Sequence, residues 1–104
     1  MKKVFICSPY SGDVLENMRK ALAYCRQAAA QCFMPYAPHL YFTRFLDDND
    51  PEQREAGIDA GLEWIADCEE VQVYGTPTDG MMVEISEAKR LGKKVVYCNA
   101  RWKE

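Results

Sequence analysis

The chain has 104 residues, of which 48% are hydrophobic and 28% charged, and its formal net charge is −3. This length suits a single domain (1–104), and the apolar fraction is high enough for a core, which excludes an intrinsically disordered chain. The thirteen Lys and Arg residues are scattered, which argues against a surface for polymeric nucleic acid. No apolar run approaches the roughly 18 residues that a membrane span needs.

The cysteines and the first residues indicate the compartment. Five cysteines, an odd number without a C-x-x-C pair, are spread along the chain: Cys7, Cys25, Cys32, Cys68 and Cys98. Buried free thiols in a reducing cytosol explain them best. The spacing around the single histidine, His39, does not suit zinc, and the first apolar segment is too short for a signal peptide. We therefore expect a cytoplasmic protein with no metal and no cofactor.

The first third of the chain predicts a strand, a turn and a helix. Residues 2–8 form a short apolar run that ends before Pro9, as in a buried strand. Asp13 is suited to cap a helix, with Glu16 three residues later. The helix is predicted over 14–32, because apolar residues recur there with helical spacing. This stripe is expected to face the core and comprises Met18, Leu22, Cys25, Ala28 or Ala29, and Cys32.

The middle of the chain predicts a short strand, a long loop and a second helix. Residues 32–36 favour a strand, whereas 37–50 are irregular and aromatic. Structureless connections longer than ~12 residues are uncommon and often serve as lids or binding loops. Asp50 followed by Pro51 marks the start of a helix, which is predicted to reach about Ala66. We expect Ile58, Leu62 and Ile65 to share one face of it.

The last third repeats the pattern of strand, turn, helix and strand. A strand is predicted over 70–74, a turn over 75–80, a helix that ends at 91–92, and a strand over 94–98. The alternation predicts a three-layer α/β/α fold of the flavodoxin or Rossmann-like type, with a central parallel sheet of four to five strands. Ligands of such sheets bind at the carboxyl ends of the strands, here the turns at 8–13 and 75–80.

Two carboxylates lie where apolar residues are expected. On a helical wheel from Met81, Glu84 falls at about 300°, inside the stripe that contains Ile85 and Ala88. Asp59 lies on the flank of the stripe of the preceding helix. An inward carboxylate is costly unless it is paired or used, so both are candidates for nucleophile and general acid work. The alternative is a structural role, such as a pair with a neighbouring cation or a position at the edge of the core.

Three segments carry a resemblance to a known group of enzymes. They are Ser-Pro-Tyr-Ser-Gly at 8–12, Pro-Tyr-Ala-Pro-His at 35–39 and Asp-Gly-Met-Met-Val-Glu-Ile at 79–85. With them the chain resembles, over nearly its whole length, the nucleoside 2-deoxyribosyltransferase-like families, which include small uncharacterised bacterial and phage proteins. The resemblance implies a nucleophilic Glu84 and an Asp59 that assists the leaving base, with Asp67 eight residues further on. It also places Phe5 where these families have an active-site tyrosine, a role for which Tyr10 is then the candidate.

Further residues of the two turns are candidates for substrate binding. The resemblance implies that Thr78, with Asp79 and Gly80 beside it, contacts the sugar or a phosphate. Ser8, Ser11 and Gly12 precede a helix and can cradle a phosphate or a sugar hydroxyl, although turn and capping chemistry explains them equally well. His39 lies in the aromatic loop and suits packing or stacking on a base. Arg44 and Arg54 are phosphate candidates for which solvation is the simpler explanation.

The sequence therefore predicts an enzyme that cleaves the N-glycosidic bond of a 2′-deoxynucleoside or deoxynucleotide through a covalent glycosyl–Glu84 intermediate. One alternative is a 2′-deoxynucleoside 5′-monophosphate N-glycosidase, which would be a hydrolase dependent on the phosphate. Another is a non-catalytic nucleotide-binding or sensing module. The expected partner is a small nucleoside or nucleotide, and a homodimer or higher homo-oligomer is expected from the many aromatic residues.

Overall fold

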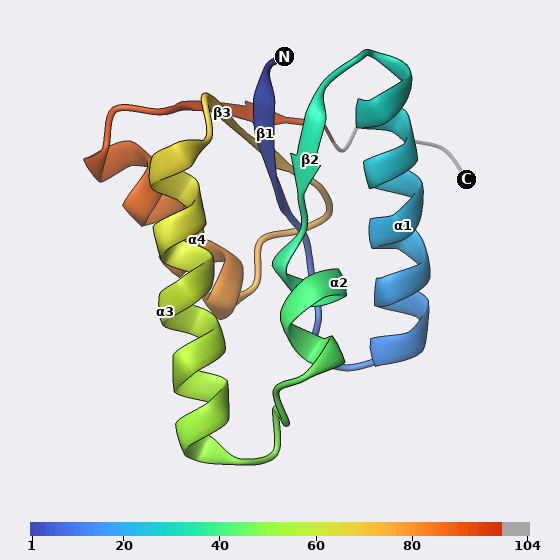
Figure 1. The fold of residues 1–104 in the computed structure, drawn as a ribbon, viewed down its shortest axis with the longest axis vertical. Helices are drawn as coiled ribbons and strands as arrows, with labels where there is room; N and C mark the ends of the chain where they lie inside the picture. The colour runs from blue at the N-terminus through green and yellow to red at the C-terminus, as the bar shows by residue number, and fades with distance from the viewer. Residues whose placement is uncertain (99–104) are drawn as a thin grey trace.

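A four-stranded parallel sheet forms the centre of the molecule in the computed structural model, which describes residues 1–98 (Figure 1). The strands are β1 (Lys3–Cys7), β2 (Met34–Tyr36), β3 (Glu70–Val73) and β4 (Lys94–Tyr97), in the spatial order β2-β1-β3-β4. After β2 the chain crosses to the opposite side of β1, so β1 and β3 flank the point where the winding direction reverses. The predicted parallel α/β fold is confirmed, and a ligand site is expected between these two strands.

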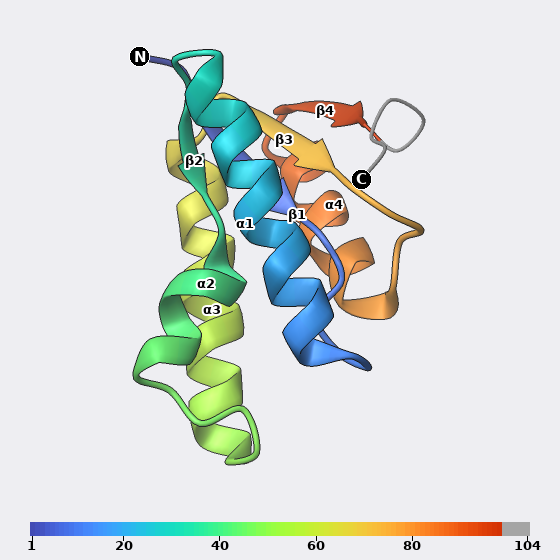
Figure 2. The same ribbon diagram turned by 90° about the vertical axis from the view of Figure 1, so that its right-hand side faces the viewer.

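Helices cover both faces of the sheet (Figure 2). Helix α1 (Val14–Ala30) packs on one face, and α3 (Pro51–Asp67) and α4 (Asp79–Arg90) pack on the other. Asp13 and Asp50 cap α1 and α3 as predicted: Asp13 accepts from the backbone N–H of Glu16, and Asp50 from those of Glu52 and Gln53. No helix within residues 1–98 has the length and apolar character needed to cross a bilayer.

Strand β1 supplies side chains to both cores because alternate residues point to opposite faces. Val4 and Ile6 pack toward α1, whereas Phe5 and Cys7 pack toward α3 and α4. All four side chains are buried. Phe5 therefore lies inside the core, and Cys7 is the residue of that face closest to the carboxyl edge of the strand.

The buried stripe of α1 differs from the predicted one. Ala21, Tyr24 and Ala28 are buried, whereas Leu22 is 48% exposed. The Tyr24 ring stacks on that of Tyr74, with a centroid distance of 3.9 Å and an interplanar angle of 8°. Small alanines on either side of Tyr24 let α1 approach the sheet, and this tertiary contact decides which face is buried.

The segment predicted as irregular contains two short helices. Helix α2 (Pro38–Tyr41) begins directly after β2, and a 3-10 helix η1 (Phe42–Arg44) continues it. The rings of Tyr41, Phe42 and Phe45 pack on one another, and those of Tyr41 and Phe42 also contact Trp64 of α3. We call residues 38–50 the lid segment. Its aromatic contacts supply the order that local sequence signals did not predict.

The cysteines are free thiols, but they are not all buried. Cys7 and Cys68 are buried, Cys25 and Cys98 are partly buried, and Cys32 is exposed. Cys32 follows the end of α1 with a φ of 64°, so the chain leaves the helix there instead of continuing the predicted apolar stripe.

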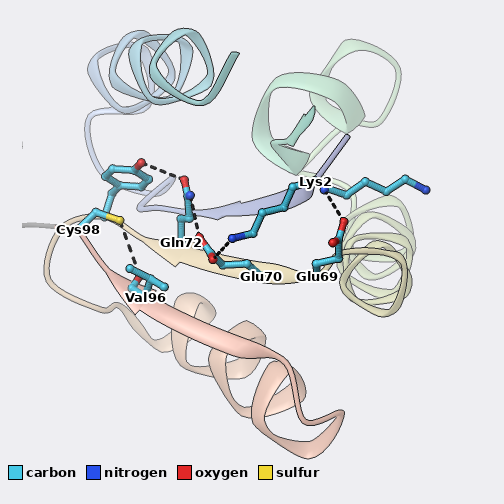
Figure 3. A network of polar contacts seen from close by, with 8 residues as sticks. Lys2, Glu69, Glu70, Gln72, Val96 and Cys98 are labelled. Carbon is cyan, nitrogen blue, oxygen red and sulfur yellow. Dashed lines mark hydrogen bonds and ion pairs between the residues drawn. The ribbon is translucent and has the colours of Figure 1, made fainter. Parts of the chain in front are cut away.

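A buried polar network lies on the face of β3 that points toward α1 (Figure 3). The Lys2 ammonium contacts Glu70 at 2.7 Å, Gln72 donates to Glu70 at 2.9 Å, and the Tyr74 hydroxyl donates to Gln72 at 3.1 Å. Burial acts to raise the pKa of Glu70, but the hydrogen bonds from Lys2 and Gln72 outweigh it and lower the pKa. The network satisfies the polar groups that β3 buries on this side.

Candidate functional site

A pocket of about 430 Å³ opens at the carboxyl ends of β1 and β3, between the turns that follow them, the lid segment and helices α3 and α4. Its volume lies within the roughly 300–1,000 Å³ that is usual for small-molecule sites. The lining combines the turn after β1, the lid segment, one side of α3 and the first turns of α4. The pocket occupies the position that the sheet order predicts for a ligand site.

The two turns that follow β1 and β3 meet beside the pocket. Gly75 has a φ of 80°, and a Cβ atom at this position would lie 3.3 Å from Cγ of Pro9. Glycine therefore permits both the positive φ of this residue and the close approach of Pro9. This contact places Ser8 near the start of α4. The Ser8 hydroxyl is buried and has no hydrogen-bond partner among the described residues.

The amino end of α4 forms another wall. Thr78 caps the helix by accepting from the backbone N–H of Met81 at 3.3 Å, and Asp79 and Gly80 follow in the first turn. All four residues line the pocket. Met81 and Ile85 are buried against the sheet, which fixes the rotation of α4 and turns the side of the helix that carries Glu84 toward the pocket.

Among the carboxylic acids of residues 1–98, Glu84 has the surroundings least favourable to its charge. The residue is half-buried, but its Oε1 atom is fully buried and has no hydrogen-bond partner among the described residues. Burial raises the pKa of Glu84 from 4.5 to about 7, and the nearby Cys7 thiol offsets part of this rise. A carboxyl group at the wall of a pocket, with one buried oxygen that has no hydrogen-bond partner among the described residues, is available for chemistry on a ligand.

The Cys7 thiol interacts with this carboxyl group. The side chain of Cys7 is fully buried, and its thiol is 3.7 Å from the carbonyl oxygen of Met81, one turn before Glu84. Burial raises the pKa of the Cys7 thiol, and the charge of Glu84 raises it further, so the group stays protonated. Cys7 is thus a hydrogen-bond donor toward Glu84 and not a nucleophile itself.

Tyr10 and His39 form an aromatic wall. Their rings stack with a centroid distance of 4.7 Å and an interplanar angle of 28°. His39 Nε2 lies 3.1 Å from the carbonyl oxygen of Ser8, so this nitrogen carries the proton and donates. Burial lowers the pKa of His39, and burial together with the charge of Asp48 raises that of Tyr10. Both side chains are therefore uncharged at neutral pH.

The lid segment and α3 complete the pocket with three residues that were not predicted for the site and with Arg54, a phosphate candidate for which solvation was the simpler explanation. Phe42, Thr43 and Asp48 come from the lid segment, and Arg54 comes from the first turns of α3. The lid segment packs closely on the helix, because a Cβ atom on Gly57 would lie 3.4 Å from Leu46 Cδ1. Asp48 belongs to a run of acidic and amide residues at 47–50, a composition that normally marks a solvated loop.

The structure brings together eight of the ten residues predicted for the site. They line one pocket and are Ser8, Tyr10, Ser11, His39, Thr78, Asp79, Gly80 and Glu84. Gly12 does not line it and has open space around it. Asp59 does not line it either, and its side chain is exposed. Asp59 lies about 160° around α3 from Gly61, which faces the pocket.

The pocket is rich in acidic groups. Asp48, Asp79 and Glu84 line it, whereas Arg54 is the one lining residue with a permanent positive charge. Within residues 1–98 there is no cluster of three or more His, Cys, Asp or Glu side chains that could hold a metal ion. The groups that line this pocket thus include carboxylates, hydroxyls, aromatic rings and a guanidinium.

Residues 2–98 match a family described as a domain of unknown function, DUF7768, and the chain belongs to this family. No curated protein matches the sequence. The fold is similar to that of a 2-deoxyribosyltransferase from the psychrotolerant bacterium Bacillus psychrosaccharolyticus, with a TM-score of 0.75 and 16% identity over 98% of this chain and 77% of that chain. It is also similar to a 2-desoxiribosyltransferase from Leishmania mexicana, with a TM-score of 0.65 and 17% identity over 93% of this chain and 63% of that chain. At these identities the likeness is one of fold.

Proposed function

We propose that this chain cleaves the N-glycosidic bond of 2′-deoxynucleosides and that Glu84 is the nucleophile. The observation that carries the proposal is the buried Oε1 atom of Glu84, which has no hydrogen-bond partner among the described residues and belongs to a side chain that lines a pocket of about 430 Å³. The position of the pocket at the carboxyl ends of β1 and β3 supports a small-molecule ligand. The similarity of fold to two deoxyribosyltransferases supports sugar chemistry of this kind.

The reaction is a double displacement at C1′ of the sugar. A carboxylate oxygen of Glu84 gives its electron pair to C1′ while the bond from C1′ to the base nitrogen breaks and its electron pair stays on the base. Water or a second base then attacks C1′ and releases Glu84, as in retaining glycosidases. Hydrolysis and transfer differ only in this second acceptor.

Other residues of the pocket suit a sugar and a base. The buried Ser8 hydroxyl has no partner among the described residues and is available to a sugar hydroxyl. The aromatic wall of Tyr10 and His39 provides a surface on which a planar base can stack. Together with Glu84, these groups suit the sugar and the base of a nucleoside.

Incubation of the protein with each 2′-deoxynucleoside and 2′-deoxynucleoside 5′-monophosphate, followed by measurement of free base, tests the proposal. We expect base release from nucleosides. Release that requires the phosphate would identify a monophosphate N-glycosidase, in which Arg54 would contact the phosphate. Ligand-dependent thermal stabilisation without any base release would instead identify a non-catalytic binding module and would contradict the proposal.

Asp59 provides a test of how the leaving base is assisted. Its side chain is exposed and outside the pocket lining, so we expect Asp59→Asn to retain base release within about twofold of wild type. The measurement compares a natural nucleoside with one that carries an acidic, activated leaving group. A loss of about 10²-fold or more on the natural nucleoside alone would restore Asp59 as the general acid that the resemblance implies.

We also propose that the protein is a homo-oligomer, most simply a dimer. Ile58 and Val83 at the mouth of the pocket are 45% and 50% exposed, and Met82 beside them is 48% exposed. A partner subunit would cover these apolar side chains. We expect light scattering at tens of micromolar to give at least the dimer mass, and Val83→Arg to reduce it. A monomer with full activity would contradict this assembly.

A further inference from the structure

The charges in the pocket point to the kind of base that it accepts. Asp48 from the lid segment, Asp79 from α4 and Glu84 face the same space, against the single guanidinium of Arg54. The remaining titratable groups of the lining, Tyr10 and His39, are uncharged at neutral pH because of their shifted pKa values. A pocket with an excess of carboxylates and partly closed by protein favours a cationic ligand.

The aromatic wall is suited to the same ligand. The stacked rings of Tyr10 and His39 line the pocket, and the ring of Phe42 lines it as well. A planar cation that stacks on such rings gains a cation–π interaction of about 0.5–2 kcal/mol. His39 would repel a cation if it were protonated, but burial lowers its pKa.

The proton donor that the resemblance implies for a departing base, Asp59, does not line this pocket. A neutral nucleoside loses its base as an anion unless an acid protonates it. Asp59 is outside the pocket, His39 is neutral with its Nε2 proton donated to a backbone carbonyl, and the pKa of Tyr10 is raised. A base that already carries a positive charge leaves as a neutral molecule and needs no proton.

We propose that the preferred substrates are cationic N-glycosides, such as pyridinium or N-alkylated purine 2′-deoxynucleosides. This inference rests on the proposed function and adds the class of substrate. The Glu84 carboxylate gives an electron pair to C1′, and the electron pair of the glycosidic bond neutralises the positive nitrogen. One negative and one positive charge become a neutral ester and a neutral base. Loss of both charges is favoured in a site where burial penalises the carboxylate of Glu84.

The test compares nicotinamide 2′-deoxyriboside, which is a cation, with neutral 2′-deoxyinosine. For each substrate kcat/KM is divided by the rate of the uncatalysed reaction in the same buffer, which removes the intrinsic difference in lability. Because the neutral substrate lacks general acid assistance, we expect its enhancement to be lower by about 10²-fold or more. Equal enhancements, or a larger one for deoxyinosine, would overturn the inference while leaving the proposed function in place.

A double variant, Asp48→Asn with Asp79→Asn, tests whether the carboxylates of the pocket attract the cationic substrate. Both side chains are exposed, so we expect the fold to be kept, which a melting curve checks. The KM for nicotinamide 2′-deoxyriboside should rise at least fivefold more than the KM for deoxyinosine, and its dependence on salt should weaken. Glu87→Gln, which removes a carboxylate on the same helix outside the pocket, is the matched control. An unchanged KM for the cation would overturn the inference. Release of neither base would instead contradict the proposed function itself.

Discussion

Replacement of Glu84 by glutamine should abolish base release and at the same time stabilise the folded protein above pH 7. The amide cannot attack C1′, so we expect a loss of at least about 10³-fold in kcat, in the range seen when a nucleophile is removed. The stabilisation has a separate cause. The pKa of this carboxyl group is 4.5 in the unfolded chain and about 7 in the folded protein.

The direction of the effect follows from which state gives up its proton first. Between pH 4.5 and 7 the unfolded chain is ionised at this group while the folded protein still holds the proton, so the free energy of unfolding falls as pH rises. The difference between the two pKa values corresponds to about 3 kcal/mol above pH 7. Glutamine does not ionise, so the difference in unfolding free energy between variant and wild type should grow by about this amount from pH 4 to pH 8.

Denaturant unfolding at several pH values, with base release measured on the same samples, checks both parts. Glu87→Gln is the matched control, because Glu87 lies on the same helix but forms a surface pair with Arg90 at 2.6 Å. It should retain activity and show no comparable change with pH. A Glu84→Gln variant that is less stable than wild type at every pH would indicate a structural partner for this carboxylate.

The pH dependence of the reaction provides a second large effect. Only the ionised form of Glu84 is a nucleophile, and its pKa is about 7. For a substrate without a titrating group, kcat/KM should therefore fall about tenfold per pH unit below 7 and level off above 8. A profile that is flat between pH 5 and 8 would contradict the assignment of Glu84.

Cys7 allows the midpoint of this profile to be shifted. Its thiol lowers the pKa of Glu84, so Cys7→Ala should move the midpoint to higher pH with little loss of plateau activity. Cys68→Ala is the control, because Cys68 is equally buried in the same core but is not among the groups that shift the pKa of Glu84. Equal midpoints in both variants would show that Cys7 does not act on Glu84.

The order of elements was predictable because local signals and tertiary packing agree along most of the chain. Asp13, Asp50 with Pro51, and the glycine at 92 mark helix ends, and each serves that purpose in the structure. The lid segment was not predicted as helical, because α2 and η1 are too short for periodicity and depend on contacts with Trp64. The prediction of the buried face of α1 was wrong, because the stacking of Tyr24 on Tyr74 turns the face with Tyr24 toward the sheet and leaves Leu22 exposed.

The orientation of Glu84 was predictable, because the buried neighbours on its helix dictate it. Glu84 could be placed from its angle to Ile85 and Ala88, since these residues must face the sheet. The expectation that Asp59 leans inward failed because the side of α3 that faces the pocket is set by two glycines. Gly57 and Gly61 pack against the lid segment, and glycines, which have no apolar side chain, do not reveal this face in the sequence. Asp48 was not predicted for the site, because the acidic and amide residues at 47–50 are typical of a solvated loop.

The most direct test of the account is whether the sugar becomes attached to Glu84 during turnover. A 2′-deoxy-2′-fluoroarabinosyl nucleoside would slow release of the sugar, and mass spectrometry of the intact protein and its peptides would locate the adduct. We expect the mass of one fluorinated sugar on the peptide that contains Glu84, and none on the Glu84→Gln variant. Base release with no adduct, or with an adduct on another residue, would contradict the proposed mechanism.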